Sequence, residues 1–307
     1  MTRKIFDTII IGGSIAGLSA ALTLARSLRT VAVFDTENPC NRNVLKSYNL
    51  STNDGQNPAT IIKNTKNDIA KYNLVDFFLD EVLEVKIIEH KFEVLTKSLG
   101  KFTAKSILIA TGLKDVLPEI SGMEECWGKT ILSCPYCHGY EARDQKTAIY
   151  ANGDAAHDLS ILLTNWTKDL IIVTDGKSEL NDEQMAALKL RKIQLIETKV
   201  TSLTHKNGDL SQINFSDGSS LDVPYMYASV PFEQKSDIAE QLGLKFTDSG
   251  HIQVDPTFRT SHQNIYAAGD CTAQHRALSV ASASGTTAGF TINQDFVDEL
   301  HNEFVKI

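Results

Sequence analysis

Two stretches of this chain share one pattern, in which a short apolar strand leads into a turn of small residues and then a helix. The first begins at residue 7 and the second at residue 147, 140 residues further along. Short, continuously apolar strands are typical of parallel sheets, because helices or other layers cover both faces of such a sheet. Two copies therefore predict an α/β chain with two similar domains. Its 307 residues, 42% of them hydrophobic, are enough for two cores.

The first copy carries a turn suited to a dinucleotide. Residues 7–35 predict strand, turn, helix and strand in that order, and the second strand ends in Asp35. Gly12 permits a tight turn, and Gly17 allows the helix to approach the strand closely. Ser14 stands where the G-x-G-x-x-G pattern has its second glycine, which weakens the match, although serine is small and keeps its amide N–H. Asp35 lies where a carboxylate binds ribose hydroxyls.

Between the two copies lies the run Cys134-Pro-Tyr-Cys137-His138. A Cys-x-x-Cys pair closes a small disulfide ring and can store two electrons. The adjacent imidazole can accept the thiol proton near neutral pH or stabilise a thiolate as imidazolium. Cys134, Cys137 and His138 are therefore the catalytic candidates.

The cysteine pair has other interpretations. The five cysteines form an odd and sparse set, unlike a secreted disulfide framework. Half of a zinc site would need two more ligands, and no second close pair is present. Cys-x-x-Cys-His also matches the rule for haem attachment, but no export signal precedes it. A structural disulfide or inert thiols are a further alternative, and we expect no metal.

Charge and hydropathy exclude some classes of function. The net charge is −8 and no basic stripe is present, so nucleic acid is not expected as a partner. No stretch approaches the roughly 20 apolar residues that span a bilayer. The N-terminal residues lead directly into a strand, so we expect no signal peptide and a cytoplasmic protein.

Two further patterns, Ala110-Thr111-Gly112 and Ala268-Gly269-Asp270, lie on either side of the stretch that holds the cysteines. With the first turn and the Cys pair, they resemble the low-molecular-weight thioredoxin reductases, which are flavoprotein disulfide reductases with two dinucleotide domains. The run 134–141 is most similar to a branch that includes dithiol oxidases such as gliotoxin sulfhydryl oxidase. The resemblance covers nearly the whole chain.

The resemblance implies two Rossmann-like domains of three-layer ββα form, the second inserted into the first. The FAD domain would comprise residues 1–115 and 246–307, and residues 116–245 would form an NAD(P)-binding-like domain that carries the cysteines. Cys137 would face the flavin, Cys134 would exchange with substrate, and the protein would be a homodimer. The positions expected to bind FAD are Gly12, Gly13, Ser14, Ala16, Gly17, Asp35, Thr111, Gly112, Gly269, Asp270, Arg276 and Ala277.

The second copy departs from that family. Ala151 stands where the first glycine is expected, and its Cβ can block the tight turn or the phosphate, while Gly153 and Asp154 follow it. The family carries a His-Arg-Arg cluster after the next strand, and its guanidinium groups can clamp the 2′-phosphate of NADP. This chain has Asp175 there, which would repel that phosphate but could accept from a free ribose hydroxyl. We therefore expect a degenerate nicotinamide site and doubtful use of NAD(P)H.

These observations favour an FAD-dependent dithiol–disulfide oxidoreductase. Its substrate would be a small dithiol or a thioredoxin-like protein, with O2 or a protein electron donor as the other partner. One alternative is an NAD(P)H-dependent thioredoxin reductase. Another is a flavin-bearing redox sensor without turnover.

Overall fold

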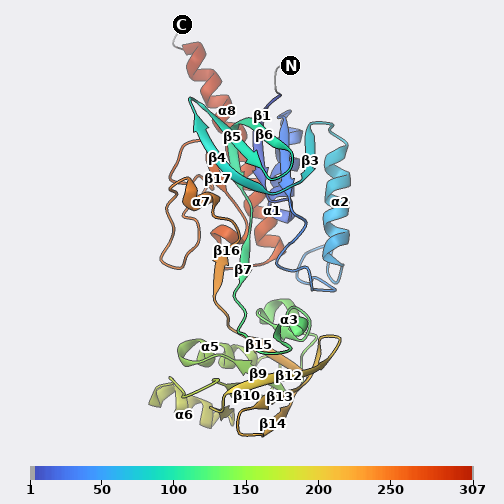
Figure 1. Ribbon diagram of the computed structural model, residues 1–307, viewed down its shortest axis with the longest axis vertical. Coiled ribbons are helices and arrows are strands. Elements are labelled where there is room, and N and C mark those ends of the chain that lie inside the picture. The colour runs from blue at the N-terminus through green and yellow to red at the C-terminus, as the bar shows by residue number, and fades with distance from the viewer. Residues whose placement is uncertain (1–3, 306–307) are drawn as a thin grey trace. The chain divides into compact units, whose positions relative to one another are not determined.

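The structure, a computed structural model, describes residues 4–305 and divides into two compact units (Figure 1). The first unit comprises Met1–Cys40, Asn49–Lys114 and Glu233–Ile307, and the second comprises Asn41–Tyr48 and Asp115–Phe232. Each unit has its own parallel sheet and its own buried clusters. The predicted α/β class is confirmed.

The first unit is built on a parallel sheet in the order β3-β2-β1-β6, with β17 beside β6. Strands β4 and β5 continue from β6 as an antiparallel meander. The strands are β1 (Ile5–Ile11), β2 (Val31–Asp35), β3 (Val75–Leu79), β4 (Val82–Ile88), β5 (Lys91–Thr96), β6 (Gly100–Ile109) and β17 (Ile265–Ala267). The helices are α1 (Ile15–Arg26), α2 (Pro58–Ala70), α7 (Ile238–Gln241), the 3-10 turn η1 (Asp270–Thr272) and α8 (Leu278–Val305).

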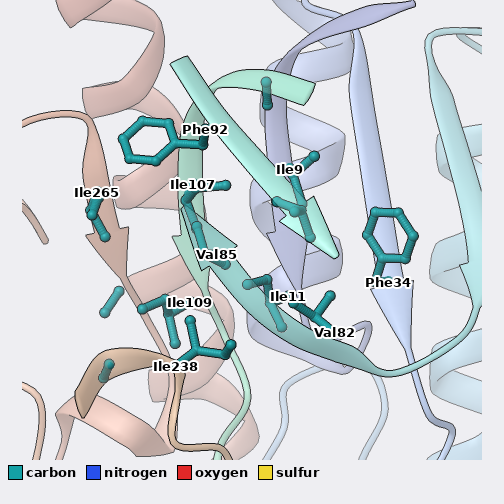
Figure 2. Packing of buried hydrophobic residues seen from close by; sticks show 14 of the residues in the cluster. Ile9, Ile11, Phe34, Val82, Val85, Phe92, Ile107, Ile109, Ile238 and Ile265 are labelled. Atoms are coloured by element: carbon teal, nitrogen blue, oxygen red, sulfur yellow. The ribbon is translucent and has the colours of Figure 1, made fainter. Parts of the chain in front are cut away.

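Alternation along β1 divides the first core into two layers. Ile9 and Ile11 join the cluster that lies under β4 and β5, and Ile10 joins the cluster under the helices α1 and α8. Figure 2 shows Ile9, Ile11 and Ile107 directed toward Val82 and Val85 of the crossing strand β4. This is the predicted three-layer ββα arrangement, with the meander on one face of the sheet and helices on the other.

Helices α1 and α8 approach closely because α8 carries glycines where they meet. A Cβ at Gly285 would overlap the carbonyl oxygen of Ala16, and a Cβ at Gly289 would lie 2.8 Å from the Cβ of Thr23. The hydroxyls of Ser19 and Ser282 are 3.0 Å apart across the same contact. The small residues of α8 therefore hold it against the helix that follows the first turn.

The second unit repeats the parallel sheet, in the order β11-β10-β9-β15-β8. A separate antiparallel sheet, β12-β13-β14, accompanies it. The strands are β8 (Ile131–Leu132), β9 (Thr147–Tyr150), β10 (Leu170–Val173), β11 (Gln194–Ile196), β12 (Val200–Lys206), β13 (Asp209–Phe215), β14 (Ser220–Asp222) and β15 (Tyr225–Ala228). The helices are α3 (Met123–Cys126), α4 (Pro135–His138), α5 (Gly153–Leu163) and α6 (Asp182–Leu190).

The division of the chain differs from the predicted boundaries of 115 and 246 in two places. Residues 233–245 belong to the first unit, because Ile238 and Leu244 are buried in its core. Residues 41–48 belong to the second unit, although the surrounding sequence belongs to the first. The strands β7 (Leu113–Asp115) and β16 (Phe232–Gln234), where the chain passes between the units, pair with each other.

No helix within residues 4–305 is both long enough and apolar enough to cross a membrane.

Candidate active site

In the first unit, the predicted cofactor motifs meet at one edge of the sheet. Strands β1, β2, β6 and β17 are parallel, so their carboxyl ends share that edge. Each motif follows the end of one of these strands or, for Asp35, forms its last residue. This edge is where open α/β sheets bind ligands.

The first turn has no room for a side chain at any of its three glycines. Gly12 has a φ of 112°, and a Cβ there would overlap the Ala110 carbonyl oxygen. A Cβ at Gly13 would lie 2.8 Å from the Asp35 side chain, and one at Gly17 would overlap the Gly12 carbonyl oxygen. The structure therefore brings Gly12, Gly13, Gly17 and Asp35 together, as the sequence pattern predicts.

The start of α1 suits an anion. Ser14 occupies the N-cap position, but its side chain makes no capping hydrogen bond. The free amide N–H groups of the first helical turn lie at this end of α1, which is also the positive end of the helix dipole. A backbone that excludes a Cβ at Gly12, Gly13 and Gly17 and a helix N-terminus without a side-chain cap fit the pyrophosphate of a dinucleotide.

The motif at the end of β17 is also closely packed. Gly269 has a φ of 86°, and a Cβ there would lie 2.8 Å from the Ala16 side chain. Its amide donates to Ser284 Oγ of α8 at 2.9 Å. Arg276 Nε lies 3.6 Å from Asp270 Oδ2, so these two predicted residues are together. Ala277 accepts a hydrogen bond from the Ala281 amide in the first turn of α8.

Two neighbours of Asp270, Cys40 and His251, were not foreseen from the sequence. The Cys40 thiol approaches Asp270 Oδ2 at 3.9 Å. His251 is buried, its Nδ1 is 3.0 Å from Ser249 Oγ, and it also bonds to the Ala273 backbone. Burial and the nearby Arg276 lower the pKa of His251 below its ordinary value.

In the second unit, a short helix holds the cysteine pair. Cys134 precedes α4 as its N-cap residue, and Cys137 lies inside that helix. The Cys137 thiol donates to Cys134 Sγ at 2.7 Å. Gly139 ends this turn against Trp166, where a Cβ would lie 2.8 Å from the indole. Both residues are partly exposed, and the short distance between their sulfurs means that a small movement would close a disulfide.

His138 is held by the segment 41–48. Its ring meets the Tyr48 ring edge-on, with centroids 5.8 Å apart, and it makes a hydrogen bond to the Lys46 backbone. Burial lowers the pKa of His138, and the bond to Lys46 opposes that shift. The imidazole is therefore neutral near pH 7, a form that can accept a thiol proton.

The second turn differs in shape from the first. Ala151 keeps a negative φ, and the positive φ of 55° falls on Gly153 instead. The Asn152 side chain accepts from the amides of Gly153 and Glu179 and donates to the Lys177 carbonyl. The Asn152 side chain thus caps the start of α5 and also binds the loop 177–179.

Both carboxylate oxygens of Asp175 accept hydrogen bonds from other parts of the second unit. Its Oδ2 accepts from the Tyr150 hydroxyl at 2.8 Å, and its Oδ1 accepts from the Val200 amide at 2.6 Å. Asp154, also predicted here, accepts from Gln184 Nε2 at 2.7 Å. The carboxylates bind parts of the chain in the place where the family pattern expects a nucleotide.

Two other cysteines, Cys126 and Cys271, are buried. Burial raises the pKa of the Cys126 thiol and raises that of Cys271 to about 12. Among the described residues, no three His, Cys, Asp or Glu side chains gather as a metal site.

Two dinucleotide-binding folds, one with a turn shaped for a pyrophosphate and one with a Cys-x-x-Cys helix, define a flavoprotein disulfide oxidoreductase. Residues 6–286 match the family described as pyridine nucleotide-disulphide oxidoreductase, so the chain belongs to that family. It is an oxidoreductase of the thioredoxin reductase type, as the sequence resemblance predicts.

Named relatives agree with this assignment. The chain is 29% identical to "Thioredoxin reductase sirT" of Leptosphaeria maculans, over 94% of both chains. It is 29% identical to "Thioredoxin reductase aclD" of Aspergillus oryzae, over 94% of this chain and 95% of that one. The structure of "Putative Thioredoxin Reductase TrxB from Bacillus anthracis" superposes with a TM-score of 0.92 at 33% identity, over 96% of this chain and 99% of that one. The structure of HlmI superposes with a TM-score of 0.91 at 28% identity, over 98% and 96%.

Proposed function

We propose that this protein is an FAD-dependent dithiol–disulfide oxidoreductase that does not use NADPH. The second turn carries this proposal. Asn152 ties the loop 177–179 across the start of α5, and both carboxylate oxygens of Asp175 already accept hydrogen bonds. A 2′-phosphate would meet acidic side chains there instead of a guanidinium cluster.

The first unit would hold FAD at the carboxyl edge of its sheet. Gly12 and Gly13 would let the pyrophosphate approach the backbone, Asp35 would accept from the adenosine ribose, and Asp270 would contact the flavin side. Thr111 and Gly112, which follow β6, would line the same edge. Bound FAD supplies a two-electron carrier that returns the cysteine dithiol to its disulfide.

The cysteine pair would exchange with substrate by two sulfur displacements. A substrate thiolate attacks Cys134 Sγ, the Cys134–Cys137 bond breaks, and Cys137 leaves as a thiolate. The second substrate thiolate then attacks its own sulfur in the mixed disulfide and releases Cys134. The substrate loses two electrons as a disulfide, and the pair gains them. Neutral His138 would accept a thiol proton.

The partners follow from this chemistry. The substrate would be a small dithiol or a thioredoxin-like protein. The other partner would be O2, which accepts the electrons and is reduced to peroxide, or a protein electron donor. We also propose a cytoplasmic homodimer.

An anaerobic titration tests the proposal. Flavin absorbance is followed while NADPH, NADH and dithiothreitol are added in turn to the yellow protein. We expect bleaching by the dithiol alone, reversed by air with formation of peroxide. The Cys137→Ser variant should keep its flavin and lose bleaching by the dithiol. Rapid bleaching of the native protein by NADPH would contradict the proposal.

The second candidate is an NAD(P)H-dependent thioredoxin reductase. The names of the relatives favour it, since several are called thioredoxin reductase. The same titration distinguishes the two, because this enzyme would bleach with a nicotinamide and then reduce a thioredoxin.

A further inference from the structure

Tyr227 lies in a buried cluster of the second unit, beside β8, the strand that precedes the cysteine pair. It belongs to β15 and pairs in parallel register with Leu132 of β8 and Ile149 of β9. Its side chain is 1% exposed, and it shares a buried cluster with those two residues and with Ala142, which follows the cysteine helix.

The Tyr227 hydroxyl has no hydrogen-bond partner among the residues that the structure describes. A buried hydroxyl without a partner is costly, since it has lost water without gaining another acceptor. Such a group points to an acceptor that is present in another state of the molecule.

The backbone places Cys134 on the same face of the sheet as Tyr227. Leu132 and Tyr227 are paired and lie in one cluster, whereas their preceding neighbours Ile131 and Met226 lie in the cluster on the other face. Ser133 is exposed, and Cys134 keeps an extended backbone with φ −123° and ψ 111°. Side chains two positions apart in an extended chain share a face, so Cys134 returns to the side of Leu132.

We propose that the Tyr227 hydroxyl is a positioning group that donates a hydrogen bond to Cys134 Sγ once the Cys134 thiol has lost its proton and become a thiolate. This inference rests on the proposed exchange of Cys134 with substrate. The bond would stabilise Cys134 as the sulfur that attacks and leaves, and it would satisfy the buried hydroxyl only when Cys134 is a thiolate, which differs from the thiol form that the structure describes.

The surroundings of Tyr227 keep it a donor. Burial raises its pKa above the ordinary value, and Cys134, Glu141, Cys137 and Tyr225 raise it further. The hydroxyl therefore stays protonated throughout the range in which thiols titrate. Glu141 is the other possible acceptor, and the experiment below separates it from the sulfur.

The test compares the pH profile of alkylation in matched variants. In a Cys137→Ser background, iodoacetamide modification of Cys134 is followed by the mass of the tryptic peptide 130–143, with and without Tyr227→Phe. Loss of a hydrogen bond to a charged acceptor should move the midpoint of the alkylation profile to higher pH by about one unit in Tyr227→Phe. Alkylation of Cys134 at pH 7 should then be about tenfold slower in that variant. Tyr225→Phe, on the same strand and face, is the control and should leave the profile unchanged.

Folding does not obscure the result, because phenylalanine fills the same space and removes only the hydroxyl. Thermal unfolding of the disulfide form should occur at the same or a higher temperature in Tyr227→Phe. An unchanged alkylation profile in a folded Tyr227→Phe would overturn the inference and indicate that Glu141 is the acceptor. A shift seen only for Cys137, measured in a Cys134→Ser background, would also overturn it. Because alkylation needs no flavin turnover, failure of the proposed function would appear separately, as the absence of bleaching by dithiol.

Discussion

At the scale of single residues, equivalent positions in the two units have opposite backbone requirements. Gly12 follows β1 with a φ of 112°, while Ala151 follows β9 with a negative φ. A side chain is excluded at the first position and accommodated at the second. The two turns therefore share their place in the fold and differ in what they can bind.

Replacing Gly12 tests the first turn. Gly12→Ala should yield protein with little or no bound flavin, because its Cβ would overlap the Ala110 carbonyl oxygen in addition to the strain of a positive φ. Flavin absorbance per mole of purified protein is the measurement. The control is Gly100→Ala, which has a φ of 86° but no atom within 4 Å of its Cβ. Equal flavin content in both variants would contradict the assignment.

His138 should make stability depend on pH. Because burial lowers its pKa in the folded state, the unfolded chain binds more protons on this imidazole as the pH falls. Its contribution is fully present above the unfolded value of about 6.5 and is lost as the pH falls through the lower folded value. Urea unfolding followed by circular dichroism at pH 7.5 and 5.5 should show a smaller acid loss in His138→Asn than in the native protein. His90→Asn, at an exposed site between β4 and β5, should behave like the native protein.

At the scale of elements, the start of α5 is stabilised by side chains where a dinucleotide fold has a ligand. Asn152 caps the helix and bonds to the loop 177–179, and Asp175 joins β9 to β12 through Tyr150 and Val200. The helix and strands keep the dinucleotide arrangement, while its binding turn has become part of the unit's own structure.

Asp175→Asn should therefore destabilise the protein. The asparagine side chain has one carbonyl oxygen where aspartate has two carboxylate oxygens, so it cannot replace the bonds from both Tyr150 and Val200. A partly buried group that loses its partner costs about 1–3 kcal/mol. Denaturant unfolding gives the change in the free energy of unfolding. Asp154→Asn, which alters a solvent-exposed hydrogen bond from Gln184 Nε2, should cost much less. An Asp175→Asn protein as stable as the native one would show that this carboxylate is not structural.

At the scale of the whole molecule, the chain has two separate cores with different spectroscopic probes. Both tryptophans, Trp127 and Trp166, lie in the second unit, and the proposed flavin site lies in the first. Tryptophan fluorescence therefore reports on the unit that holds the cysteines, and flavin release reports on the other.

Added FAD should stabilise one unit only. At 100 times its Kd, a ligand stabilises the fold that binds it by about 2.7 kcal/mol, which raises the Tm of a domain of this size by about 5–10 °C. We expect that rise in the flavin-release transition and no change in the tryptophan transition. NADPH should move neither. A tryptophan transition that rises with NADPH would mean that the second turn binds it.

Short apolar runs in the sequence were enough to predict several of the buried parallel strands. Strands β1, β9 and β10 lie where short apolar runs predicted them, because such runs are buried on both faces. Strand β3 was missed, since it is only partly buried and lacks that signal.

Long-range contacts could not be predicted in this way. The glycine motifs, the cysteine pair and Asp270 were identified because each belongs to a recognisable local pattern. The contacts of Tyr48 with His138 and of Tyr227 beside Leu132 join residues 90 or more positions apart, and no pattern in either segment indicates the other. Asp175 was identified as a departure from the family pattern, but its bonds to Tyr150 and Val200 appear only in the folded chain.

The segment 41–48 has a consequence for how this protein can be divided. Residues 115–232 form an uninterrupted stretch that a cloning strategy would choose as a stand-alone redox fragment. Such a fragment would lack the Tyr48 ring and the Lys46 backbone that hold His138, and the Val44 side chain that covers Gly128. Residues 41–48 would have to be restored to such a fragment, by fusion or as a synthetic peptide, before its His138 imidazole could be positioned as in the full chain.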